Sequence, residues 1–183
     1  MASWLVPLLV QVGLSLRLLW SNTAFLNEAQ YLYAGHQELA NKLRMLGYDT
    51  YFSGHPSLYP VLGALVDSIG GLTAARLLGL AFMLLATWLL YRMTTDMFGP
   101  VAGCAAALAF AAIAPTQFLS AFATYDPMAM AMLAVAAYCA HRATWTATRH
   151  DGALVLSFIA LLIADFTKYA VVLYTPVVLA ILL

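Results

Sequence analysis

Apolar runs long enough to cross a bilayer alternate with short polar segments along most of the chain. A bilayer core needs roughly 20 apolar residues per helix, and this pattern predicts a single membrane domain over residues 1–183. The predicted membrane helices are residues 3–20, 72–91, 101–122, 127–141, 153–167 and 169–183. The last apolar run reaches Leu183 without a polar flank, so we expect a truncated sixth helix in a fragment of a longer protein.

Residues 21–70 form a long segment that is too polar to span, and we expect two surface helices within it. At about 100° per residue, Leu32 and three further leucines share one sector, opposite a polar sector. These leucines are Leu39, Leu43 and Leu46, and the opposite sector holds Gln30, Gln37, Asn41 and Arg44. Residues 57–69 are apolar but too short to span, and Gly70-Gly71 then breaks the chain. The predicted fold is an all-α polytopic transmembrane bundle, with two surface-lying amphipathic helices in the first outer loop.

Composition supports a membrane protein and excludes a nucleic-acid partner. The chain is 64% hydrophobic and 9% charged, with a mean hydropathy of +0.87, whereas soluble domains carry about a quarter charged residues. The formal net charge is zero, and binding to nucleic acid needs clustered basic residues. Cys104 and Cys139 are isolated in apolar runs, so we interpret them as buried thiols rather than a disulfide or a metal pair.

Basic residues predict the orientation in the membrane. Arg92, Arg142 and Arg149 follow the helix ends opposite residues 21–70. Under the positive-inside rule this places residues 21–70 outside the cytoplasm, although Lys168 falls on the same side as they do. We therefore expect a multi-pass protein of the plasma membrane with its active face outside.

Four ionisable residues are expected to meet at the outer face: Glu28, Arg76, Asp126 and Lys168. Ionisable residues beside hydrocarbon are costly and mark functional sites. A carboxylate can deprotonate an acceptor hydroxyl, and a cation can stabilise an anionic leaving group. The arrangement suits a group-transfer reaction.

Short motifs in a fixed order carry a resemblance to a known family. They are Arg17 near the end of the first helix, Asn27-Glu28-Ala29-Gln30-Tyr31, Gly54-His55-Pro56-Ser57-Leu58-Tyr59, Ala75-Arg76-Leu77, Tyr125-Asp126-Pro127 and Lys168. The order resembles the amino-terminal part of GT-C glycosyltransferases, specifically the protein O-mannosyltransferase and aminoarabinose-transferase group (family 39 type). The resemblance implies an inverting hexosyltransferase that moves a sugar from a polyprenyl-phosphate donor to a hydroxyl of a protein, lipid or glycan.

The resemblance also implies roles for individual residues. Glu28 and Asp126 match acidic motif positions and are the catalytic candidates, while Arg76 and Lys168 match cationic positions that face the donor phosphate. Further candidates for contacts to substrate or metal are Asn27, His36, His55 and Tyr59. Where the family has Asp-Glu this chain has Asn27-Glu28, and asparagine cannot act as a base. Either Glu28 has taken over that role or the reaction is lost.

The sequence does not require a metal ion. Oxygen and nitrogen ligands for a divalent ion that bridges phosphate oxygens are nevertheless offered by Glu28, Asp126, His36 and His55. Their spacing matches no metal signature.

Each candidate also has a structural interpretation. Asp126 before Pro127 is a good helix cap, and Glu28 is suited to cap the surface helix. Arg76 can extend toward lipid headgroups, and Lys168 can pair with Asp165.

Two other functions stay open from the sequence. A transporter or flippase for a lipid-linked sugar or small solute predicts broken helices and a polar group near the membrane midplane. A non-catalytic assembly or anchoring subunit is compatible with asparagine at position 27.

Overall fold

The computed structural model describes residues 3–40, 57–145 and 151–182. Within these ranges every regular element is helical and none is a strand, which confirms the all-α prediction. The elements are α1 (Leu5–Ser21), α2 (Leu26–Leu39), α4 (Leu58–Phe98), α5 (Pro100–Ala112), α6 (Ala114–Leu119), α7 (Tyr125–Trp145), α8 (Asp151–Thr167), the 3-10 helix η2 (Tyr169–Tyr174) and α9 (Thr175–Ile181). The expected surface-helix leucines Leu43 and Leu46 lie outside the described residues.

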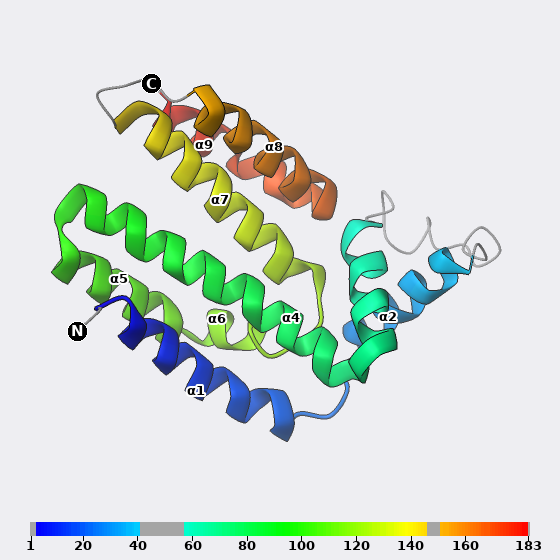
Figure 1. The fold of residues 1–183 in the computed structure, drawn as a ribbon. Helices are drawn as coiled ribbons and strands as arrows, with labels where there is room; N and C mark the ends of the chain where they lie inside the picture. Colours follow the sequence, from blue (N-terminus) through cyan, green and yellow to red (C-terminus); the bar gives the residue numbers. More distant parts are fainter. Residues whose placement is uncertain (1–2, 41–56, 146–150, 183) are drawn as a thin grey trace.

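Gly70 and Gly71 divide α4 into two parts, as the sequence predicts. Gly71 has φ 66° and ψ −170°, a conformation that residues with a Cβ rarely adopt. The chain turns at this point, so that residues 58–69 lie beside α2 while residues 72–98 run along the bundle (Figure 1). Glycine is therefore required at the corner between the predicted surface helix and the following helix.

Membrane-spanning length is shown for one helix. By length and composition, α4 alone among the described helices is long and apolar enough to cross a membrane. α1 and α2 pass the same test only when they are taken together, and they meet at an angle of 83°. The segments Pro100–Ala112 and Tyr169–Ile181 are apolar but shorter. The finding is one such helix, or two if the bent pair counts as one span.

The region expected as one helix over residues 101–122 is divided in two. α5 ends at Ala112, and Ile113 is extended, with φ −72° and ψ 142°. Pro115 has no N–H for an intrahelical bond, and inside a helix its ring clashes with the carbonyl one turn earlier. In the first turn of α6 neither problem arises. The sixth expected helix also differs, because it begins as η2 and becomes α-helical only from Thr175.

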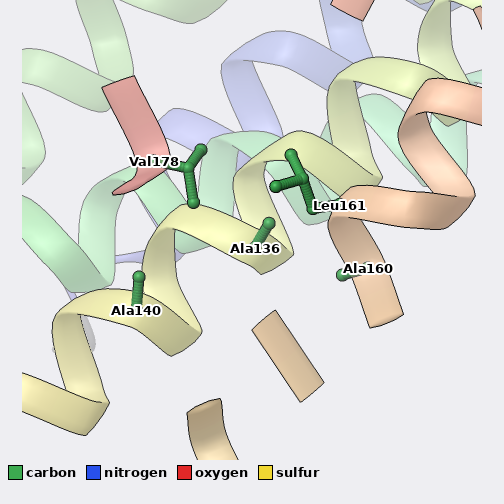
Figure 2. Packing of buried hydrophobic residues seen from close by; sticks show 5 residues of the cluster. All are labelled: Ala136, Ala140, Ala160, Leu161 and Val178. Atoms are coloured by element: carbon green, nitrogen blue, oxygen red, sulfur yellow. The ribbon is translucent and has the colours of Figure 1, made fainter. Parts of the chain in front are cut away.

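Helices α4 and α7 form the centre of the bundle. α7 packs against α4 on one side and α8 on the other, while α1 and α5 pack on α4 (Figure 1). Figure 2 shows the contact of α7, α8 and α9, where the buried residues are Ala136, Ala140, Ala160, Leu161 and Val178. Small side chains let helix backbones approach closely, so alanine at these positions favours close packing of α7 against α8.

A buried polar cluster joins α1, α4 and α6. Gln11 is fully buried, accepts a hydrogen bond from Thr87 Oγ1 at 2.5 Å and donates one to Ser120 Oγ at 3.1 Å. The Thr87 hydroxyl shares its single hydrogen between Gln11 Oε1 and the carbonyl of Met83, and the Ser120 hydroxyl donates to the carbonyl of Thr116. Interhelical bonds of this kind stabilise helix pairs in apolar surroundings, so the cluster fixes how α1 packs against its neighbours.

Gly35 allows α2 to approach the first part of α4, and we expect Gly35→Ala to disrupt this contact. A Cβ at Gly35 would lie 1.9 Å from the Pro60 carbonyl oxygen and 2.8 Å from Ala64 Cβ. The two helices must separate, which costs about 1–3 kcal/mol, measurable as a lower thermal unfolding temperature in detergent micelles. Gly13→Ala is the control, because nothing lies within 4 Å of its added Cβ. Equal unfolding temperatures for Gly35→Ala and wild type would contradict this packing.

Candidate functional site

Arg76 and Glu28 form an ion pair inside the bundle, which we call the buried pair. Arg76, on α4, donates from Nε to Glu28 Oε1 at 2.9 Å and from Nη2 to Oε2 at 2.8 Å. Glu28, on α2, is fully buried, and Arg76 is 4% exposed. Two parallel N–H···O bonds are the strongest arrangement of an arginine and a carboxylate. Arg76 therefore does not extend toward lipid headgroups.

The guanidinium of Arg76 has no hydrogen-bond donor left for a ligand. Nη1 donates to the carbonyls of Leu19 at 2.7 Å and Asn22 at 3.1 Å, and Nη2 also donates to the carbonyl of Thr23 at 2.9 Å. With the two bonds to Glu28, these account for all five N–H groups that an arginine carries. The Phe122 ring covers the cation, 5.3 Å from Cζ. In this arrangement Arg76 cannot bind a donor phosphate.

Glu28 is saturated in the same way. Besides Arg76, Oε2 accepts the N–H of Phe25 at 2.9 Å and Oε1 accepts the N–H of Ala123 at 2.7 Å. A carboxylate offers about four acceptor positions, and all are used. The bond from the Phe25 N–H caps the start of α2, the structural role that the sequence suggests for Glu28. Glu28 thus holds α2, α4 and the segment before α7 together, and no lone pair remains to take a proton from a substrate.

Asp126 and Lys168 form a second ion pair, which we call the half-exposed pair. Lys168 Nζ donates to Asp126 Oδ1, and the two side chains are 33% and 28% exposed, respectively. Asp126 lies in the first turn of α7 rather than at the cap, and Lys168 directly follows α8. Lys168 does not pair with Asp165, because Lys168 has extended backbone angles and leaves the helical path.

The charge state of Lys168 is set by opposing effects. Burial lowers the pKa of its ammonium group, but the hydrogen bond and the negative charge of Asp126 outweigh burial, so that the pKa is raised. The Tyr125 ring, 5.2 Å from Nζ, adds a cation–π contact. Lys168 is therefore a fixed cation at neutral pH.

The half-exposed pair lines a cavity of about 330 Å³ whose other lining residues are uncharged. These residues are Leu119, Ala129, Met130, Leu133, Ala170, Val171, Leu173 and Tyr174. One carboxylate and one ammonium group thus stand beside an apolar wall built by α7, η2 and the end of α6. An apolar cavity with a few polar groups is the usual form of a small-molecule site.

Both pairs lie at the end of the bundle near α2, but they do not share a cavity. Tyr31 of α2 packs against Tyr125, with ring centroids 4.6 Å apart, and Ala123 links Glu28 to the segment before Asp126. The cavity lining includes Asp126 and does not include Glu28. The four ionisable residues expected to meet at the outer face therefore form two separate pairs: Asp126 borders the cavity, whereas Arg76 and backbone N–H groups enclose Glu28.

The remaining candidates are dispersed. Asn27 lies on the exposed side of α2, and His36 pairs with Asp67 at 2.8 Å. Tyr59 is fully buried, and its hydroxyl has no hydrogen-bond partner among the described residues. His55 lies outside the described residues.

The described residues contain no group of three His, Cys, Asp or Glu side chains arranged to hold a metal ion. Of the four metal-ligand candidates, Glu28 is enclosed, His36 is engaged by Asp67 and Asp126 by Lys168. The chemistry that the described site offers is therefore that of a carboxylate and an ammonium group.

Comparison of the chain with models of protein families, with curated proteins and with solved structures finds no match. The family resemblance consequently rests on the sequence motifs, and the geometry of the site is the other observation that bears on function.

Proposed function

We propose that the chain is the amino-terminal module of a multi-pass membrane glycosyltransferase of the GT-C type. It would move a sugar from a polyprenyl-phosphate donor to an acceptor hydroxyl at the outer face of the plasma membrane. The observation that carries the proposal is the half-exposed pair beside an otherwise uncharged, largely apolar cavity. A lipid-linked sugar phosphate needs a cation for its phosphate, an apolar wall for its tail and a base near its sugar.

Lys168 and Asp126 divide these tasks. The donor phosphate takes the place of Asp126 on the Lys168 ammonium, which frees the Asp126 carboxylate. Asp126 then accepts the proton of the acceptor hydroxyl as that oxygen bonds to the anomeric carbon. The bond from this carbon to the phosphate oxygen breaks on the opposite face, which inverts the configuration. Lys168 stabilises the charge of the departing polyprenyl phosphate.

The buried pair positions this site without touching the substrate. Glu28 holds the N–H of Ala123, three residues before Asp126, and Arg76 joins Glu28 to the carbonyls of Leu19 and Asn22 at the end of α1. The carboxylate of Asp126 is thereby presented from a fixed helix start. Preorganisation of this kind is a large part of catalysis by charged groups.

A non-catalytic anchoring subunit is the second candidate function. Asn27 favours it, because the family that the chain resembles has an aspartate at this place, and Asn27 lies exposed rather than beside the cavity. The two candidates differ in whether the intact protein transfers sugar.

The test is sugar transfer from a radiolabelled polyprenyl-phosphate sugar by the intact protein in proteoliposomes. We expect Asp126→Asn to reduce the rate about 10²–10⁴-fold, as loss of a general base does, while the protein stays folded. Asp151→Asn is the matched control, since Asp151 begins α8 and Lys168 follows its other end. Transfer that is unchanged in Asp126→Asn, or absent in wild type, would contradict the proposal.

A further inference from the structure

A second cavity lies at the opposite end of the bundle from the two ion pairs, between α1 and the last turns of α4. It has a volume of about 790 Å³ and is lined by the aromatic residues Trp4, Trp88 and Tyr91 together with Arg92. Leucines form its apolar wall: Leu8, Leu84 and Leu85. We call this cavity the tryptophan groove. Indole rings beside an arginine are typical of a membrane–water interface.

The walls of the groove are fixed by hydrogen bonds. Tyr91 is 6% exposed, and its hydroxyl group lies 2.7 Å from Ser3 Oγ, the residue next to Trp4. Cys104 Sγ donates to the Ser3 carbonyl at 3.7 Å. The start of α1, next to Trp4, is therefore tied to α4 and α5.

Arg92 supplies the positive charge in the groove lining and forms no ion pair with a described carboxylate. Its guanidinium lies over the Trp88 ring, with Cζ 5.8 Å from the ring centroid. Asp96, one turn further along α4, also lines the groove; its carboxylate forms no ion pair with Arg92 and lies 3.9 Å from His141 Nε2, without a hydrogen bond to it. The N–H groups of Arg92 are thus available to an anion that enters beside Trp88.

We propose that the tryptophan groove binds one anionic phospholipid, with its phosphate on Arg92 and an acyl chain along Leu8 and Leu84. Basic pockets between membrane helices on the cytoplasmic side suit anionic headgroups, and the basic residues predict that this end faces the cytoplasm. The inference shares with the proposed function the assumption that the bundle lies in a membrane. It does not depend on sugar transfer.

The test uses quenching of tryptophan fluorescence in nanodiscs that contain a small fraction of brominated lipid. Brominated phosphatidylglycerol is compared with brominated phosphatidylcholine at equal content. We expect stronger quenching by the anionic lipid, and the difference should shrink in Trp88→Phe and disappear in Trp4→Phe/Trp88→Phe, because both tryptophans line the groove. Arg92→Gln should weaken apparent binding about fivefold, the effect of one basic residue at a membrane surface. Arg17→Gln is the matched control, since Arg17 is exposed near the other end of α1.

The outcomes separate the lipid from other sources of phosphate. Equal quenching by the two lipids, or equal behaviour of Arg92→Gln and Arg17→Gln, would overturn the proposal. Displacement by millimolar glycerol 3-phosphate would also overturn it, because it would show a site for free phosphate esters rather than lipid. No sugar donor is present, so a negative result removes the lipid site and leaves the proposed transferase to its own test.

Discussion

Replacing Arg76 with methionine is expected to lower the free energy of unfolding by about 3–5 kcal/mol. The change leaves the Glu28 carboxylate buried without its counter-charge. It also leaves the carbonyls of Leu19, Asn22 and Thr23 without the N–H groups they accept. Titration with sodium dodecyl sulfate in mixed micelles, followed by circular dichroism, measures the loss.

Two further variants make this prediction specific. Arg17→Met removes an exposed arginine and should change stability by no more than about 0.5 kcal/mol. The double variant Glu28→Met/Arg76→Met removes both buried charges, but the N–H groups of Phe25 and Ala123 lose their acceptor. It should recover only part of the loss. If Arg76→Met is as stable as Arg17→Met, the buried pair does not hold the helices together.

Replacing Lys168 with methionine is expected to lower kcat/KM for the polyprenyl-phosphate donor about 10²–10³-fold, in the range seen when one preorganised electrostatic contact is lost. Methionine keeps much of the apolar stem but cannot stabilise the phosphate. Because a third of the Lys168 side chain is exposed, the helix bundle should stay folded. Steady-state transfer at varied donor concentration, with circular dichroism on the same samples, measures both effects.

Charge and pH provide the controls for Lys168. Lys168→Arg keeps a cation and should retain part of the activity that Lys168→Met loses. The pKa of Lys168 is raised, so its ammonium group stays charged through neutral pH. Its attraction for the donor phosphate is lost only as the pH rises through that raised pKa. Unchanged kinetics in Lys168→Met would show that the donor phosphate binds elsewhere.

The corner at Gly70-Gly71 could be predicted from sequence, whereas the break at Ile113 could not. Two adjacent glycines mark a turn because positive φ suits few other residues, and Gly71 has such an angle. Pro115 favours a break near this point, but neighbouring groups can satisfy the freed backbone of a proline within a membrane helix, so Pro115 alone does not predict one. Ile113 is extended, and the α6 that follows it packs against α1, a tertiary contact that a local pattern does not show.

The sequence identified the charged residues of the site but not how they pair. Arg76 is saturated by backbone carbonyls, which every residue carries, so no side-chain pattern marks Leu19, Asn22 or Thr23 as partners. Lys168 lies close to Asp165 along the chain, yet its extended backbone, with φ −151° and ψ 108°, directs it to Asp126 instead. Both outcomes depend on tertiary contacts. The Gln11 cluster was missed for the same reason, since a lone glutamine in an apolar run gives no indication of its partners.

The most direct test of the account compares sugar transfer in Glu28→Gln and Asp126→Asn at a temperature at which both proteins remain folded. The two variants make the same chemical change at the buried pair and at the half-exposed pair. We expect folded Glu28→Gln to keep most of its transfer rate, because glutamine still offers an oxygen to the Ala123 N–H, whereas the rate of folded Asp126→Asn should fall about 10²–10⁴-fold. A folded but inactive Glu28→Gln beside an active Asp126→Asn would contradict the account.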